Sequence, residues 1–94
     1  MNDYIEDNLK NEIDKLINLF KQKKFNDALI LSNKLIEKAN NIPFLLNLNG
    51  LIYLSLEKWT NAVLAFQKAL EYDANFVEAY NNMGVAYSHL GNND

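Results

Sequence analysis

The sequence predicts an all-α fold, an α-solenoid of antiparallel helix hairpins with about five helices. Two observations lead to this fold class. Apolar residues recur at helical spacing, as Ile13, Leu16, Ile17 and Phe20 do, and no segment has the pattern of a strand. The chain is also similar to itself after a shift of 34 residues, which is typical of repeat architectures.

The 34-residue shift aligns residues of matching type. It places Ala28 over Ala62 and Phe25 over Trp59. Polar residues whose side-chain oxygens can cap a helix fall into two further columns, Asp7 with Asn41 and Asn75, and Asn26 with Thr60 and Asp94. We therefore expect these polar residues to be N-caps.

Between these columns, the apolar spacing predicts helices over residues 4–22, 27–39, 43–56, 61–72 and 77–90. Turns are expected at the segments KQKKF, EKW and GNN. Pro43 suits the first position of its helix, where a missing N–H breaks no hydrogen bond. Short helices joined by short turns form antiparallel hairpins.

Composition narrows the class of protein. The 94 residues form one small domain, and 49% of them are hydrophobic, which is enough for a packed core. The formal net charge is −3, with no Cys and no Arg, which argues against nucleic-acid binding and thiolate metal sites. No apolar run is long enough to cross a membrane, and the N-terminus is too acidic for a signal peptide, so we expect a cytoplasmic protein.

No residue pattern indicates catalysis. His89 is the sole histidine, and the sequence offers it no recognisable nucleophile or second ligand, so we expect a solvent-facing side chain. No serine lies in a G-x-S-x-G motif, and there is no glycine-rich phosphate loop. The chain is therefore predicted not to be an enzyme and to have no catalytic residues, cofactor or metal.

Residues 43–74 resemble a tetratricopeptide repeat. The resemblance is carried by Trp59 and by small and aromatic residues at the spacing of that motif, namely Gly50, Tyr53, Ala62, Phe66 and Ala69. It implies a single domain over residues 1–94 with two and a half repeats. These are a degenerate first repeat at 9–42, a second at 43–76, and the first helix of a truncated third at 77–94.

Two departures from the motif concern its interior. Ser32 stands where the family has an aromatic residue, and Asn49 stands where it prefers Leu. A buried Asn needs hydrogen-bond partners. We interpret Asn49 as tolerated drift.

The resemblance implies a non-catalytic protein–protein interaction module whose partner is a peptide or a helix. In such proteins the first helices of successive repeats line a concave groove. Carried over place by place, the groove candidates are Ile17, Asn47, Leu48, Leu51, Glu78, Asn81, Asn82 and Val85.

Family members that clamp the C-terminal carboxylate of chaperones use Lys, Arg and Asn at five places. Those places here hold Ile13, Ile17, Leu48, Glu78 and Asn82. No cation is present among them, and Glu78 would repel a carboxylate. The sequence therefore predicts that this chain is not a chaperone clamp.

The last predicted helix lacks a covering helix. Tyr87 and Leu90 are expected on the uncovered face, which favours the N-terminal part of a longer array. One alternative is the docking or oligomerisation arm of a larger enzyme, for example a transferase, whose catalytic domain lies beyond Asp94. Another is a homodimer formed through this last helix.

Overall fold

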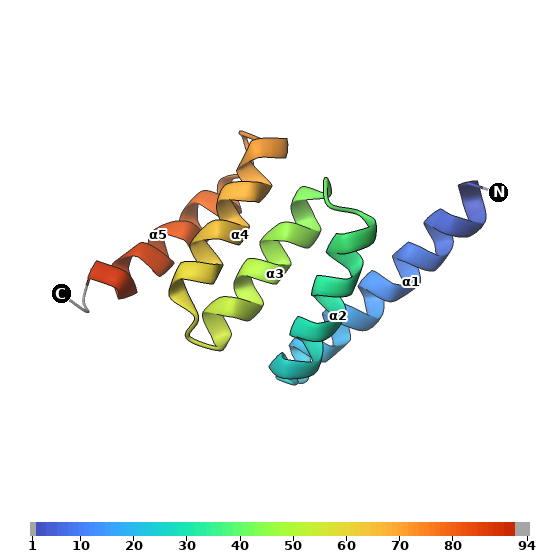
Figure 1. Cartoon of the computed structure of the whole chain (residues 1–94), viewed down its shortest axis with the longest axis horizontal. Coiled ribbons are helices and arrows are strands. Elements are labelled where there is room, and N and C mark those ends of the chain that lie inside the picture. Colours follow the sequence, from blue (N-terminus) through green and yellow to red (C-terminus); the bar gives the residue numbers. More distant parts are fainter. Residues whose placement is uncertain (1, 92–94) are drawn as a thin grey trace.

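The computed structural model of the protein describes the backbone of residues 2–91 and the side chains of residues 8–91. This part of the chain contains helices and no strand: α1 (Asn2–Lys21), α2 (Phe25–Lys38), α3 (Pro43–Ser55), α4 (Trp59–Tyr72) and α5 (Val77–Gly91). α1 packs on α2, α3 packs on α4, and α5 packs on both α3 and α4 (Figure 1). The predicted all-α architecture of helix hairpins is confirmed. None of these helices is long and apolar enough to span a membrane.

Both hairpins close with the same backbone turn. Lys23 and Glu57, which are 34 residues apart, have positive φ angles of 61° and 59°. In each turn the amide of the following residue donates to the carbonyl five residues earlier. Lys24 donates to Leu19 at 3.0 Å in the first hairpin, and Lys58 donates to Tyr53 at 2.9 Å in the second. This is the Schellman pattern, which satisfies carbonyl groups at the end of a helix.

The prediction that Asn26 and Thr60 are N-caps is wrong. α2 and α4 begin one residue earlier than these positions, and the N-cap residues are Lys24 and Lys58, without a side-chain cap bond. The turn explains the difference. The residue that completes the Schellman pattern is already the N-cap of the next helix, so no residue remains between the two helices for a polar cap.

Asn41 and Asn75 are not N-caps either, Asp7 lies inside α1, and Asp94 lies outside the described residues. Ile42 holds the N-cap position of α3, again without a side-chain bond. Asn75 precedes α5, and its backbone N–H donates to Oδ1 of Asp73 at 3.1 Å. Asp73 therefore organises this connection through an Asx turn.

Two apolar clusters form the core. The first lies mainly between α1, α2 and α3, and its buried members are Leu16, Ala28, Leu35, Leu45, Leu48 and Ile52. The second joins α3, α4 and α5, and its buried members are Leu46, Ala62, Val63, Phe66, Ala69, Ala79 and Ala86. Ile36 and Leu51 contact both clusters, so the core is continuous along the stack.

Gly50 of α3 lies directly against the aromatic ring of Phe66 on α4. A methyl group built on Gly50 would lie 2.7 Å from Cδ1 and Cζ of Phe66, whose side chain is fully buried. Gly84 is the equivalent residue of α5, and a methyl group there would meet nothing within 4 Å. The two glycines therefore have opposite surroundings despite equal places in the repeat.

Ser32 and Asn49 are both buried and hydrogen-bonded to each other. Nδ2 of Asn49 donates to Oγ of Ser32 at 2.8 Å and to Oδ1 of Asn33 at 3.1 Å. Oγ of Ser32 in turn donates to the carbonyl of Leu29 at 3.0 Å. The interpretation of Asn49 as drift is thus wrong, because the two departures from the motif satisfy one another across α2 and α3.

The two glycines provide a matched pair of substitutions. Gly84→Ala should stabilise the protein by about 0.5–1 kcal/mol, because Ala loses less backbone entropy than Gly inside a helix. Gly50→Ala should destabilise it by about 1–3 kcal/mol, because the methyl group displaces the Phe66 ring in a packed core. Urea unfolding followed by circular dichroism measures both, and equal effects at the two sites would contradict the packing described.

The Ser32–Asn49 pair can be tested with a double-mutant cycle. Ser32→Ala should cost about 1–2 kcal/mol, because a buried amide donor loses an acceptor. With Asn49→Leu added, the double variant should be more stable than the sum of the single changes by about 1 kcal/mol. Purely additive unfolding free energies in the same urea experiment would show that the pair is not coupled.

Candidate functional site

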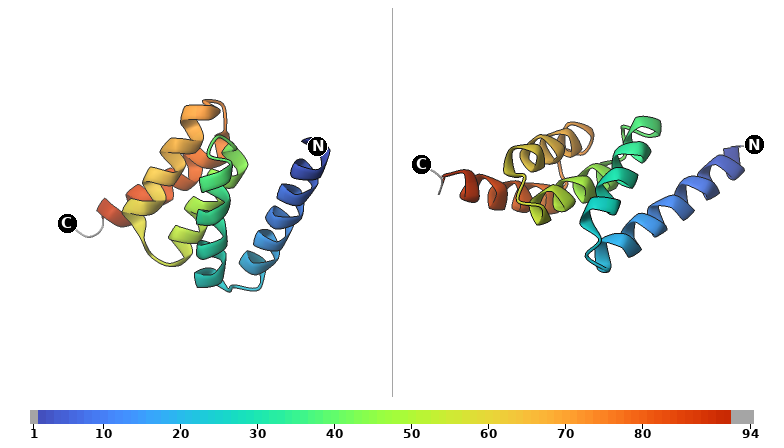
Figure 2. Two further views of the ribbon diagram at one scale, coloured as in Figure 1. Left: turned by 45° about the vertical axis from the view of Figure 1, so that its right-hand side comes forward. Right: turned by 60° about the horizontal axis from the view of Figure 1, so that its bottom comes forward.

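The predicted groove residues lie on α1, α3 and α5, which form one layer of the molecule, with α2 and α4 in the other (Figure 2). α3 and α5 are in direct contact. Nδ2 of Asn82 on α5 donates to Oδ1 of Asn47 on α3 at 3.2 Å. The structure therefore brings together two groove candidates that are 35 residues apart in the sequence.

Four of the candidates have most of their surface in the core. Asn47 is 3% exposed and Leu48 is 6% exposed. Leu51 is half-buried between the two apolar clusters, and Ile17 is half-buried against the first cluster. Direct contact with a peptide would therefore fall mainly to the other four candidates.

Those four candidates lie on α5. Glu78, Asn81 and Val85 are exposed, and Asn82 is half-buried. Glu78, Asn82 and Val85 are spaced i, i+4 and i+7, so they share the face of α5 on which Asn82 meets α3. Phe44, near the start of α3, is 48% exposed. This surface is made of amide and apolar groups with one carboxylate.

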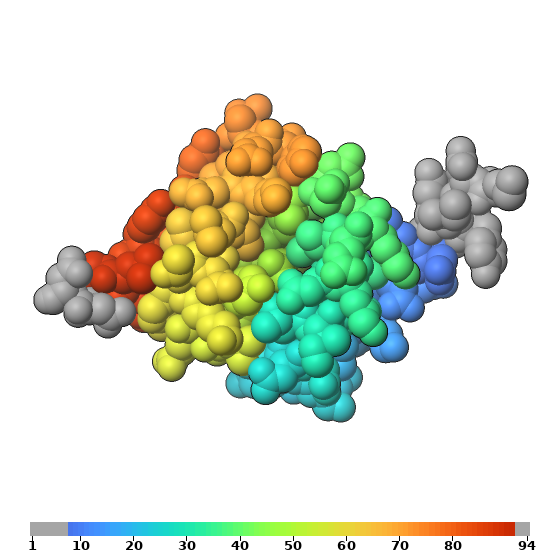
Figure 3. Space-filling model, in the orientation of Figure 1, coloured from blue at the N-terminus to red at the C-terminus, as the bar shows by residue number. Residues whose placement is uncertain are grey.

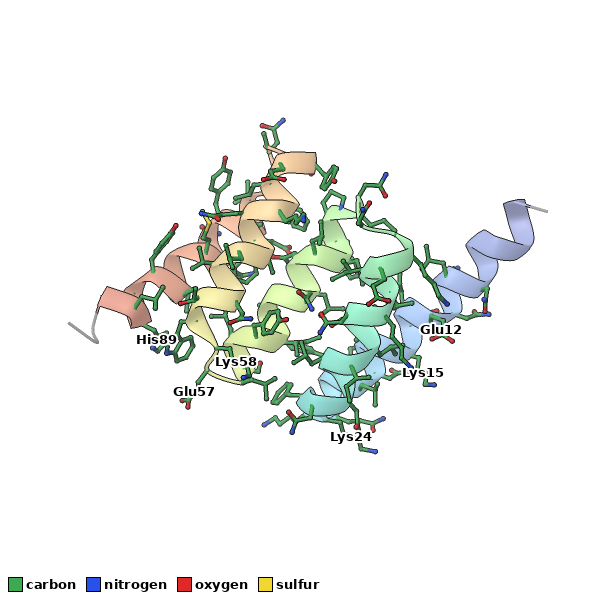
Figure 4. All side chains as sticks on the ribbon, viewed as in Figure 1. Glu12, Lys15, Lys24, Glu57, Lys58 and His89 are labelled. Atoms are coloured by element: carbon green, nitrogen blue, oxygen red, sulfur yellow. The ribbon has the colours of Figure 1, made fainter. Side chains whose placement is uncertain are left out.

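His89 has a neighbour that sequence reasoning missed. Its ring is stacked on the ring of Trp59, with centroids 3.9 Å apart and an angle of 4° between the planes. The side chain is exposed and lies beside the turn that carries Glu57 and Lys58 (Figure 4). The stack joins the start of α4 to the end of α5. In the described part of the chain no cluster of His, Asp and Glu could hold a metal ion.

The face of α5 that was predicted to be uncovered is partly exposed. Tyr80 is 51% and Tyr87 is 48% exposed, and the Tyr87 hydroxyl accepts a hydrogen bond from Nε2 of Gln67 at 3.3 Å. Leu90 is half-buried and packs against the second cluster. Tyr87 therefore offers more free surface than Leu90, and self-association through this face stays a prediction.

Comparison with known proteins identifies a repeat pattern and a fold. The family model described as the TPR repeat matches residues 50–91. The second TPR domain of Spaghetti (RPAP3), bound to the HSP90 peptide SRMEEVD, aligns with a TM-score of 0.85 at 23% identity, over 89% of this chain and 78% of that one. The second TPR domain of human RPAP3, in complex with the HSP70 peptide SGPTIEEVD, aligns with a TM-score of 0.81 at 23% identity, over 86% and 68%.

A search of curated proteins found no match. At 23% identity the two solved structures show the fold alone, while the repeat model adds the sequence pattern of the second hairpin and α5. The fold of TPR domains thus covers most of the chain, and the repeat pattern covers residues 50–91. Residues 50–91 therefore carry the tetratricopeptide-repeat pattern, within a chain that shares the fold of solved TPR domains.

Proposed function

We propose that this chain is a non-catalytic protein-interaction module that binds an extended peptide or a partner helix along α3 and α5. The observation that carries the proposal is the hydrogen-bonded pair Asn47 and Asn82, which lies between the two helices at the centre of the groove candidates. The structural neighbours support a peptide as the ligand class, because both were solved with peptides bound.

The chemistry of this surface suits an extended backbone. The bond between the two amides uses one N–H of Asn82 and the oxygen of Asn47, which leaves the oxygen of the half-buried Asn82 for a ligand, whereas the buried Asn47 holds Asn82 in place. Asn81 adds a further exposed amide. Val85 and Phe44, each 48% exposed, provide apolar contact on either side.

The proposed ligand differs from the peptides of the neighbours. Both of those peptides end in Glu-Val-Asp, which places several carboxylates at one end. Here the places that hold cations in chaperone-clamping relatives are Ile13, Glu78 and Asn82, and none of them is positive. A ligand of mainly uncharged and aliphatic residues avoids repulsion from Glu78.

The charge of Glu78 can be tested with the peptide SRMEEVD. Glu78→Lys should bind this peptide at least about tenfold more tightly than the wild-type chain, because a repulsive carboxylate becomes an attractive ammonium. Isothermal titration calorimetry measures both affinities. Glu57→Lys makes the same charge change in an exposed turn and should leave the affinity near the wild-type value. Wild-type affinity equal to that of Glu78→Lys would contradict the proposed ligand preference.

The groove itself can be tested with a random 16-residue peptide library panned against the wild-type chain. The enriched peptides should include a class that binds Val85→Glu at least about tenfold more weakly, because the new carboxylate removes apolar contact and adds a second negative charge beside Glu78. The same peptides should bind Leu64→Glu as tightly as wild type, because Leu64 lies on α4 in the other layer.

Circular dichroism provides the folding control for both variants. The proposal would be wrong if no enriched peptide loses affinity on Val85→Glu while that variant remains folded. It would also be wrong if each enriched peptide lost affinity equally on both variants, since a groove ligand distinguishes the two layers.

A further inference from the structure

Two hollows outside the groove are related by the repeat of the sequence. The first lies between α1 and α2, has a volume of about 310 Å³, and is lined by Lys15, Leu19, Asp27, Ile30, Leu31 and Lys34. The second has a volume of about 240 Å³, with lining residues from α2, α3 and α4. It opens between α2 and α4 on the face shown in Figure 3. No groove candidate lines either hollow.

The 34-residue shift carries the whole lining of the first hollow onto the second. The counterparts, in the same order, are Asn49, Tyr53, Asn61, Leu64, Ala65 and Lys68, and all of them line the second hollow. α2 contributes Asn33 and Ile36 as an additional wall there. The hollows are therefore one feature that occurs twice, once for each hairpin.

Each hollow is lined by an exposed aliphatic side chain and by a lysine one helical turn later. Ile30 and Leu64 are both 59% exposed, which is high for side chains of this size. Lys34 and Lys68 follow at i+4, on the same helix face. A single exposed aliphatic residue is ordinary on a protein surface. Here the same pair of types recurs at the same place of two hollows, which favours a shared role.

The charge of the hollows is opposite to that of the chain. Lys15 and Lys34 outnumber Asp27 in the first hollow, and Lys68 is the one charged residue of the second, so each carries a formal charge of +1. The whole chain has a formal net charge of −3. An acidic ligand is therefore less repelled at the hollows than over the acidic surface of the chain as a whole.

The geometry points to a second interaction surface on α2 and α4, in which the two hollows bind an acidic segment of a partner protein. Each hollow takes one aliphatic or aromatic side chain of that segment, and carboxylates of the segment pair with Lys34 and Lys68. An apolar cavity of about 150 Å³ holds benzene, so both hollows have room for such a side chain.

A protein segment fits this surface better than a nucleic acid or an anionic membrane. Phosphate polymers and anionic lipids require dense positive charge, whereas each hollow offers a charge of only +1 on an acidic chain without Arg. Two equivalent hollows also match one continuous ligand, because the second side chain binds at a raised effective concentration once the first is seated.

The test uses a random 16-residue peptide library panned against the wild-type chain. The surface should enrich acidic peptides with aliphatic or aromatic residues. These peptides should bind the double variant Ile30→Glu/Leu64→Glu at least about tenfold more weakly, because each hollow loses its apolar contact and repels acid. Val85→Glu on the opposite layer should leave their affinity unchanged, which separates this surface from the groove.

The lysines provide a second, matched comparison. Lys34→Glu/Lys68→Glu should weaken binding of the acidic peptides at least about tenfold, whereas Lys24→Glu/Lys58→Glu should change it by less than about threefold. The control pair makes the same total charge change, is also 34 residues apart, and lies exposed in the two hairpin turns (Figure 4).

Three outcomes would overturn the proposal. Equal losses of peptide affinity in the two lysine double variants would mean that only the overall charge of the chain affects binding. If the acidic peptides bound Ile30→Glu/Leu64→Glu with unchanged affinity, the hollows would not be their binding sites. A wild-type chain that sedimented as a dimer, and became monomeric in that double variant, would make a second copy of this chain the occupant in place of an acidic partner.

Discussion

Phe66 can lie against the backbone of α3 because Gly50 has no side chain, and the place of α4 follows from this contact. With α4 close to α3, alanines of α4 and α5 complete the same apolar cluster. α5 is thereby held against both helices, near enough to α3 for Asn82 to bond to Asn47. The arrangement of the groove candidates on α3 and α5 thus depends on a packing contact that contains no polar group and includes none of these candidates.

Much of this arrangement could be predicted from the sequence, because apolar spacing and a 34-residue repeat act along single helices. The bounds of all five helices differ by at most two residues from those expected. The caps could not be predicted in the same way. Lys23 and Glu57 adopt left-handed backbone angles that usually select Gly, and no Gly marks them in the sequence. The polar residue three positions later, Asn26 or Thr60, was therefore a misleading sign of the helix start.

The functional surfaces were predictable to different extents. Place-by-place transfer from the repeat family put the groove candidates on α1, α3 and α5, which lie in one layer, since the layer depends on helix order. It could not show that Asn47 and Asn82 pair, because that pairing depends on the rotation of one helix against another. The columns Ile30 with Leu64 and Lys34 with Lys68 were present in the same alignment. Their significance became clear only from the hollows in the structure, because the repeat motif specifies residue types at buried positions and does not specify them at these exposed positions.

The bond between Ser32 and Asn49 has a consequence for the order of the repeats. The residues at the same two places of the next junction are Phe66 and Met83, and both are apolar and belong to the second cluster or pack against it. A hairpin moved from one junction to the other would set an amide against a phenyl ring and a hydroxyl against a thioether. The two junctions are therefore not interchangeable, because each interface is complementary only to its own neighbouring repeat. A shuffled or slipped arrangement of the repeats is disfavoured.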